Sequence, residues 1–349
     1  MSGEPANGRW RILVLVGFAE LFVMTLWFSA SAVSPELTQM WGLTDTEQAW
    51  LTNAVQLGFV VGALLSASLT ISDTFQPRYV FAGSAFLGAT ATAVIATFVQ
   101  SALPAIVLRF ITGVSLAGVY PTGMKMMAGW FKKGRGLAIG VLVGALTVGS
   151  AAPHLLRVVG GIGNPRLVLY GATAISLVGA GLALLYREGP YQPEPSPFDP
   201  RAIGRILRDR SVALANGGYF GHMWELYAVW TWIPVYLAAS FAHRGMANPE
   251  EIASLLTFGT IAIGGVGAWL AGSAADRWGR TPVTATSMII SGSATVLAGV
   301  VFGAPIWIVA PFVLMWGFVI VADSAQFSAA VSELADPSYV GSALTLQTA

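Results

Sequence analysis

The sequence predicts an all-α polytopic membrane protein, and three observations lead to this fold class. Of the 349 residues, 55% are hydrophobic and 10% are charged, and the mean hydropathy is +0.68. A soluble domain carries about 25% charged residues because its whole surface faces water. Apolar runs of about 20 residues, enough to cross the hydrocarbon core, recur along the chain. Since backbone groups in lipid must be satisfied within a segment, we expect these runs to be helices.

The apolar runs divide the chain into ten full spans and the start of an eleventh. A polar stretch with five prolines, residues 187–210, separates the sixth run from the seventh. The last run begins near Tyr339 and stops at Ala349. The ten full runs cover residues 10–33, 48–71, 79–100, 103–128, 136–157, 167–186, 212–240, 252–275, 282–302 and 306–331.

Lysine and arginine predict the orientation of these spans. If the amino terminus is cytoplasmic, three of the 18 basic residues lie outside (Arg157, Arg166 and Arg244) and Arg109 lies within a span. The other fourteen lie inside, as the positive-inside rule requires. We therefore expect the amino terminus and the 187–210 segment to be cytoplasmic. The fourteen are Arg9, Arg11, Arg78, Lys125, Lys132, Lys133, Arg135, Arg187, Arg201, Arg205, Arg208, Arg210, Arg277 and Arg280.

Several function classes are excluded by composition. The net charge of +1 offers no basic surface for nucleic acid. Cysteine is absent, which removes disulfides, thiolate metal sites and a cysteine nucleophile. The three histidines, His154, His222 and His243, lie in separate regions, and the chain contains neither a zinc-protease motif nor a phosphate-binding loop. We expect no enzymatic activity, no cofactor and no metal.

The two sides of the polar stretch carry a weak internal repeat. Gly62 lies eleven residues before Asp73 at the end of the second span, and Gly265 lies eleven before Asp276 at the end of the eighth. Six spans, a cytoplasmic linker and a second set form the layout of transporters built from repeats.

The loop motif Gly272-Ser-Ala-Ala-Asp276-Arg277-Trp-Gly279-Arg280 resembles that of the major facilitator superfamily. Its first-half copy keeps Asp73 and Arg78 but lacks the glycines. Gly279 permits a tight turn, and Asp276 can pair with neighbouring helix ends. Further resemblance lies in Arg109-Phe-Ile-Thr-Gly113, Ala117-Gly118-Val-Tyr120-Pro121 and Trp130-Phe131-Lys132-Lys133-Gly-Arg135.

The resemblance covers the whole chain and implies the family's fold of two six-helix halves. Residues 1–186 would form the first half, 187–210 the linker, and 211–349 helices seven to ten with part of eleven. Because the family has twelve helices, we expect the chain to be truncated and inactive as it stands. In the family's antiporters the fifth helix carries a Gly-Pro motif, and Ser150-Ala-Ala-Pro153-His154 lacks its paired glycines. The stripe Gly136, Gly140 and Gly144 favours close helix packing instead.

Five ionisable residues lie well inside spans, where a charge costs about 2.5–3.5 kcal/mol on insertion scales. They are Glu20, Arg109, His222, Glu225 and Asp323. They fall in spans one, four, seven and ten, the helices that line the central cavity in the family. Each is therefore a candidate for proton coupling or substrate binding, with a structural ion pair as the competing interpretation.

Position along the helix separates these candidates. At about 1.5 Å per residue, Glu20, His222 and Glu225 share a layer near the membrane midplane. His222 and Glu225 are three apart and so share one helix face, and a histidine exchanges protons near neutral pH. We therefore predict Glu20 and Glu225 as proton-coupling residues. Arg109 would be either a counter-ion to Glu20 or a site for an anionic substrate, and Asp323 would bind or pair near the inner side.

Uncharged polar and aromatic residues of the same helices are candidate cavity walls, although tryptophans at helical spacing more often pack or anchor a helix. These candidates are Trp27, Asn53, Gln56, Tyr120, Trp224, Tyr227 and Gln326.

The resemblance implies a monomeric secondary transporter in the plasma (inner) membrane, with a small solute, protons and lipid as its partners. One buried arginine favours an organic or inorganic anion, and the acidic residues favour proton coupling. A drug-type exporter of the same superfamily and a non-transporting sensor with the same fold are the alternatives. The sequence leaves the substrate and the choice among symport, antiport and uniport open.

Overall fold

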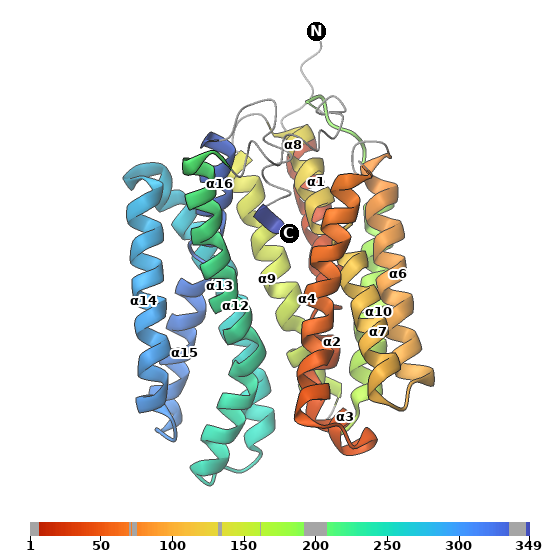
Figure 1. The fold of residues 1–349 in the computed structure, drawn as a ribbon, viewed down its shortest axis with the longest axis vertical. Coiled ribbons are helices and arrows are strands. Elements are labelled where there is room, and N and C mark those ends of the chain that lie inside the picture. The colour runs from red at the N-terminus through yellow and green to blue at the C-terminus, as the bar shows by residue number, and fades with distance from the viewer. Residues whose placement is uncertain are drawn as a thin grey trace.

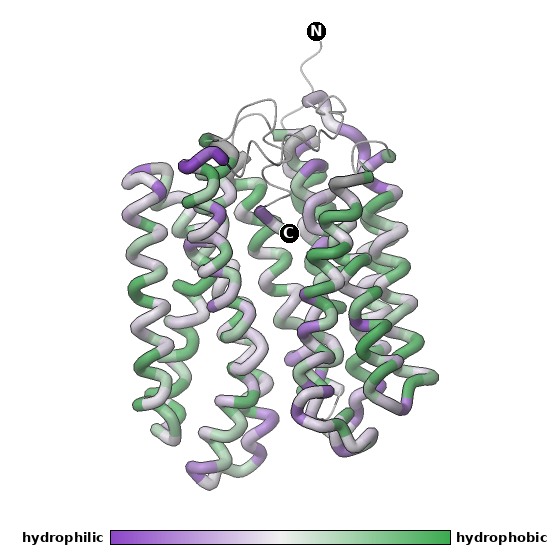
Figure 2. The backbone as a smooth tube through the Cα atoms, in the orientation of Figure 1, coloured by the Kyte–Doolittle hydropathy of each residue, from purple (hydrophilic) through white to green (hydrophobic). Residues whose placement is uncertain are grey.

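A computed structural model describes residues 7–69, 71, 75–131, 135–160, 162–191, 208–334 and 347–349. Within these ranges every regular element is a helix, which confirms the predicted fold class (Figure 1). The most strongly hydrophilic residues gather toward the two ends of the bundle, as expected for helices that cross a membrane (Figure 2). The predicted run from Tyr339 and most of the 187–210 segment lie outside the described residues.

Residues before the predicted linker form two kinds of helix, long ones that cross the bundle and short ones that continue or connect them. The helices are α1 (Asn7–Met24), α2 (Ser29–Ala32), α3 (Ser34–Trp41), α4 (Asp45–Ser68), α6 (Pro77–Phe98), α7 (Ala102–Leu116), α8 (Tyr120–Trp130), α9 (Arg135–Gly160) and α10 (Pro165–Leu184).

Residues after the linker form the second group of helices. These are α12 (Arg210–His243), α13 (Pro249–Trp278), α14 (Arg280–Val301), α15 (Ile306–Ile320) and α16 (Ser324–Leu334). Eight segments of the described chain are long and apolar enough to cross a membrane. Of the ten predicted full spans, the first (α1–α2) and the seventh (α12) do not meet both criteria, so the number of crossings stays a prediction.

Three of the predicted spans are interrupted part of the way across. The first is broken at residues 25–28, the fourth at 117–119 and the tenth at 321–323. Pro121 follows the second break, in the first turn of α8, where a proline is well tolerated. Discontinuous helices leave backbone groups free inside the membrane, and such breaks occur where transporters bind their substrates.

The two halves use the same close helix crossing. In the first half α4 packs on α7, and in the second half α13 packs on α15. A Cβ at Gly113 would lie 2.0 Å from the carbonyl oxygen of Val55, and one at Gly317 would lie 1.8 Å from that of Thr260. Only glycine allows backbones to approach so closely, so both crossings depend on a glycine in the later helix of the pair.

Helices α9 and α13 join the halves along their lengths. Gly144 of the predicted small-residue stripe faces Gly265, whose added Cβ would meet the Gly144 backbone at 3.2 Å. Gly140 of the same stripe contacts nothing within 4 Å at its Cβ position. Gly62, which matches Gly265 in the sequence repeat, has a different kind of partner. It packs on Val114 within its own half.

Large apolar side chains of α12 and α14 stay exposed. The equivalent helices of the first half, α1 and α6, are instead covered by a neighbouring helix. There α10 packs on both α1 and α6, but no helix of the described residues lies in that position against α12 and α14. The exposed side chains include Phe220 (72%), Trp224 (75%), Trp232 (60%), Val296 (78%) and Val300 (79%).

Candidate functional site

Glu20 lies in α1 and is completely buried. Neither carboxylate oxygen has a hydrogen-bond partner among the described residues. A Cβ added at Gly123 would lie 2.8 Å from Glu20 Oε2, so the carboxylate rests against the first turn of α8. Because buried polar groups are normally paired, an unpartnered carboxylate at this depth marks a site for a proton, a water molecule or a ligand.

The first turn of α8 is the positive end of a half-helix that starts inside the bundle. The Gly123 amide donates to Val119 at 2.9 Å and closes the turn. The hydroxyl of Thr122 in this turn is fully buried and has no partner among the described residues. The structure therefore places an acid and a hydroxyl, both without partners in the part of the chain that it describes, at one helix start.

An aromatic cluster connects the halves beside this region. Trp27, in the break after α1, stacks on Tyr227 of α12 with ring centroids 5.5 Å apart and planes inclined by 14°. Phe28 meets Trp230 edge to face at 6.0 Å. Trp27 and Trp230 are almost fully buried, so the predicted Trp27 and Tyr227 do come together. Trp224 does not join them, since it is 75% exposed.

The second half holds a buried polar cluster at the break before α16. His222 Nδ1 lies 2.9 Å from Asp323 Oδ1, and both side chains are nearly inaccessible. His222 Nε2 lies 2.5 Å from Ser324 Oγ, where either atom can donate depending on the tautomer. The imidazole also faces the rings of Tyr219 and Phe327. The predicted residues His222 and Asp323 thus form one pair across α12 and the break before α16.

Glu225, although three residues from His222, faces a different helix. Its Oε1 accepts hydrogen bonds from Ser291 at 2.6 Å and from Thr295 at 3.3 Å, both on α14. Trp316 donates to the same serine hydroxyl at 3.2 Å. The two residues are close together on α12, but they have different partners. His222 contacts the start of α16, and Glu225 contacts α14.

Arg109 of α7 is fully buried, and its guanidinium is directed at backbone oxygens. It donates to the carbonyl oxygens of Leu26, Trp27 and Leu51 and to the hydroxyl of Ser29. Among the described residues no ion pair joins it to Glu20 or to another acid.

The remaining predicted cavity residues are distributed unevenly. Gln326 is buried and accepts a hydrogen bond from Arg280 Nη1 at 2.9 Å, which ties the loop motif to α16. Tyr120 and Gln56 are partly buried, and Asn53 is exposed.

The turn of the predicted loop motif has the geometry that the sequence indicates. Gly279 has a φ of +90° between α13 and α14, a conformation that glycine adopts without a steric penalty. Gly272 lies in α13, with open space at its Cβ position, and Arg277 is exposed. The side chain of Asp276 and the whole of Asp73 lie outside the described residues.

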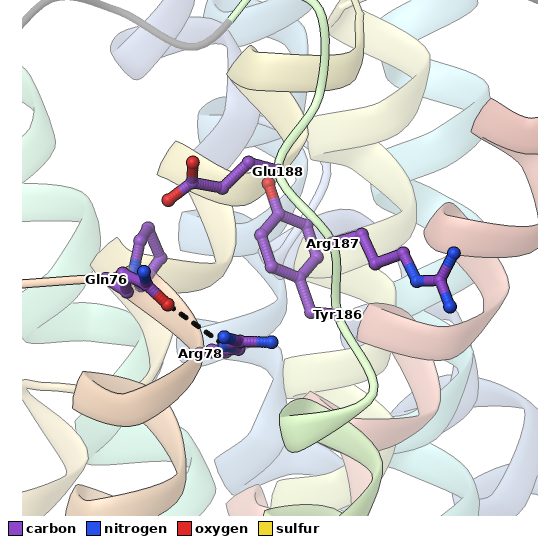
Figure 3. Close-up of a pocket in the computed structure, with 6 residues that line it drawn as sticks. Gln76, Arg78, Tyr186, Arg187 and Glu188 are labelled. Carbon is purple, nitrogen blue, oxygen red and sulfur yellow. Dashed lines mark hydrogen bonds between the residues drawn. The ribbon is translucent and has the colours of Figure 1, made fainter.

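Arg78, the base of the degenerate first-half motif, lines a small cavity at the end of the bundle that carries the amino terminus (Figure 3). Its Nε donates to Gln76 at 3.1 Å. Tyr186 lies beside it and donates its hydroxyl to the carbonyl of Met126 at 3.2 Å. The cavity has a volume of about 200 Å³, and it lies at the bundle end, apart from the Glu20 region.

Sequence reasoning missed an ionic cluster at the opposite end. Arg157 of α9 lies 2.8 Å from Glu36 of α3 and 2.6 Å from Glu250 of α13, and it donates to Ser254 at 2.9 Å. Arg157 stands 121 residues from Glu36 and 93 from Glu250. Since all three charges look like solvated helix ends in the sequence, no local pattern could have paired them.

Two helical halves, joined through α9 and α13 and carrying buried polar groups at broken helices, define a membrane transport protein. The chain belongs to the Major Facilitator Superfamily, whose family model matches residues 16–349. A transport role rather than catalysis follows from this membership.

The chain is also similar to two curated proteins, and it shares its fold with a solved structure. The chain is 25% identical over 317 residues to the "Putative metabolite transport protein" of Haemophilus influenzae, with 81% of this chain and 71% of the relative covered. It is 25% identical over 271 residues to the "Probable sulfoacetate transporter SauU" of Cupriavidus necator, covering 71% of this chain and 60% of that one. The nucleoside transporter NupG has the same fold, with a TM-score of 0.74, 12% identity and coverage of 97% and 87%.

Proposed function

We propose that this protein is a proton-coupled secondary transporter of a small organic anion, and that Glu20 carries the coupling proton. The observation that supports this most directly is the burial of Glu20 without a partner among the described residues. The protein would alternate between two conformations, and the substrate and the proton would each shift the balance between them. Coupled in this way, neither would cross the membrane down its own gradient without the other.

Two opposing influences act on the Glu20 carboxylate. Removal from water favours the neutral acid, whereas the positive end of α8 favours the ion. A small displacement of α1 against α8 changes the balance between them, because the helix-end effect falls off within one turn. The protonation of Glu20 can therefore follow the conformational cycle of the protein.

His222 and Asp323 supply a second ionisable pair in the other half. Because the imidazole and the carboxylate are 2.9 Å apart and both belong to the second half, they stay together while the halves move. We assign this pair to proton transfer or to binding of the solute in the second half. Glu225, which accepts two hydrogen bonds from α14, is the less favoured coupling residue of the two predicted.

An anionic solute is favoured by the starts of two half-helices inside the bundle. Helices α8 and α16 both begin after a break in pseudo-equivalent spans, and half-helix amino termini in transporters point at anionic groups. The unpaired hydroxyl of Thr122 adds a donor at the first of them. The name of the Cupriavidus relative makes sulfoacetate the first compound to test.

The remaining assignments belong to the same proposal. Residues 1–186 and 211–349 are the two halves, 187–210 is a cytoplasmic linker, and the protein works as a monomer in the inner membrane with its amino terminus in the cytoplasm.

The test is uptake by the full-length protein in proteoliposomes, with sulfoacetate and a panel of organic anions supplied with and without an inward proton gradient. Glu20→Gln should abolish gradient-driven accumulation while solute exchange continues. Glu47→Gln is the control, because Glu47 lies in the first turn of α4 and accepts hydrogen bonds from the nearby Thr44. Accumulation by Glu20→Gln at the wild-type level would disprove the coupling role. Gradient-dependent efflux of lipophilic cations, with no anion uptake, would favour the exporter instead.

A further inference from the structure

We infer that Arg109 is a positioning residue, whose guanidinium holds the break in the first predicted span and thereby places Trp27 at the contact between the halves. This role differs from both roles that the sequence suggested for Arg109, a counter-ion and a substrate ligand. It depends neither on the identity of the solute nor on proton coupling.

The break needs an external support. Helix α1 ends at Met24, and α2 begins at Ser29. The amides of Leu26 and Trp27 donate to Val23 and Met24 at 3.1 and 3.0 Å, which tightens the last turn. The intervening residues, 25–28, include neither glycine nor proline. A break inside the membrane takes carbonyl groups out of the helical ladder, and each one left without a partner costs several kcal/mol.

Arg109 of α7 supplies partners within the break, where the Ser29 hydroxyl also donates to the Leu26 carbonyl at 2.9 Å. Its Nη1 donates to the Leu26 carbonyl at 2.8 Å and to the Ser29 hydroxyl at 3.2 Å, and its Nη2 donates to the Trp27 carbonyl. Its Nε donates to the carbonyl of Leu51 in α4 at 3.1 Å. One side chain thus ties α7 to α4 and to both sides of the break. The planar guanidinium suits this task because its donors are fixed in one plane.

The number of donors separates positioning from substrate binding. A guanidinium has five N–H groups, and these contacts occupy four of them. The side chain is fully buried, so a solute would reach the fifth only after the break had been dismantled. A positive charge beside the carboxyl end of a helix is also favourable in itself.

The consequence lies at the contact between the halves. The carbonyl of Trp27 is held by Arg109, while its indole stacks on Tyr227 of α12. The next residue, Phe28, contacts Trp230 of the same helix. The position of the break therefore determines where the first half meets the second.

Single-cysteine reporters test this inference, since the natural chain has no cysteine. Ala30→Cys places a thiol in α2, and Ala96→Cys places a matched thiol in α6. Both alanines are buried in one cluster, at 0% and 4% exposure. Reaction with a membrane-impermeant maleimide is measured in the full-length protein, in wild-type, Arg109→Met and Arg109→Lys backgrounds.

In the Arg109→Met background, we expect the α2 thiol to react at least about tenfold faster, the effect of losing one hydrogen bond to a charged group. The α6 thiol should react at its original rate. Arg109→Lys should give an intermediate rate at the α2 thiol. Ser29→Ala, which removes one acceptor of Arg109 and the hydrogen bond from Ser29 to the Leu26 carbonyl, should give a smaller rise than Arg109→Met. Equal acceleration of both reporters would indicate general loosening and overturn the inference. Unchanged labelling of the α2 thiol with loss of solute binding would make Arg109 a substrate ligand and overturn it as well.

Discussion

Arg157 Nη2 lies 2.6 Å from Glu250 Oε2. This contact joins the two halves where α9 ends and α13 begins. Glu36, which belongs to the same half as Arg157, holds the guanidinium from the other side at 2.8 Å. Farther along the two helices, the hydroxyls of Ser150 and Thr257 are buried and have no partner among the described residues. Such an interface is well suited to separate, because water would satisfy these groups when the halves move apart.

We predict that weakening this contact exposes the α9–α13 interface. The reporter is Thr257→Cys, at a position that is now fully buried, labelled with an impermeant maleimide. Glu250→Gln should accelerate labelling only about twofold to fivefold, because a half-exposed ion pair contributes less than about 1 kcal/mol. Arg157→Met should accelerate it more, since the contact to Ser254 is lost as well.

Glu251→Gln is the matched control for the interface. Glu251 is the exposed neighbour of Glu250 in the first turn of α13. If the two glutamine variants accelerate labelling equally, the effect comes from charge at the helix end and the contact between Arg157 and Glu250 has no separate role.

A second prediction concerns the space beside Glu20. In Gly123→Ala the new methyl group would lie 2.8 Å from the carboxylate, so the acid or α8 has to move. We expect gradient-driven accumulation to fall at least fivefold, a loss of about 1 kcal/mol in the coupled step. Gly140→Ala, in α9, meets nothing within 4 Å and should leave accumulation unchanged. Equal transport by both variants would show that the Glu20 region tolerates displacement.

The pair of His222 and Asp323 can be examined by a double-mutant cycle. Removing one partner of a buried pair leaves the other uncompensated, at a cost of about 3–5 kcal/mol. We expect His222→Gln and Asp323→Asn each to lower the free energy of unfolding in denaturing detergent by an amount of this order. The double variant should lose less than the sum of the two. Additive losses would mean that the two side chains do not interact.

The predicted topology has its own measurement. Ser196→Cys lies in the segment that the positive-inside rule places in the cytoplasm. It should resist an impermeant thiol reagent added to intact cells and react after the membrane is permeabilised. Rapid labelling of intact cells would reverse the orientation of the whole chain.

Some features of the site were predictable because they depend on residue type and spacing alone. A charge inside a long apolar run is costly wherever its helix packs, so Glu20, His222 and Asp323 could be singled out as unusual. Partners were harder to predict. His222 was expected to act with Glu225, three residues away, but it pairs with Asp323 of the tenth predicted span.

Arg109 shows the same limit more sharply. Its burial could be expected from its span, but its partners are backbone carbonyls, and these become available only because the first helix breaks at residues 25–28. That segment contains neither glycine nor proline, so no residue type in it predicts the break, whereas its backbone and aromatic side chains contact α7 and α12. Helix propensity depends on the residue types within a short segment, so it cannot predict contacts with distant helices.

The sequence by itself determined the membrane-spanning helical class, the family resemblance, the turn at Gly279 and the presence of ionisable residues inside long apolar runs. These properties follow from hydropathy, spacing and backbone chemistry within one segment. Only the tertiary structure decided that Arg157 joins the halves, that Arg109 supports a broken helix and that Glu20 is left without a partner among the described residues. Each of these depends on distances between helices far apart in the chain, which are set by packing of the whole bundle.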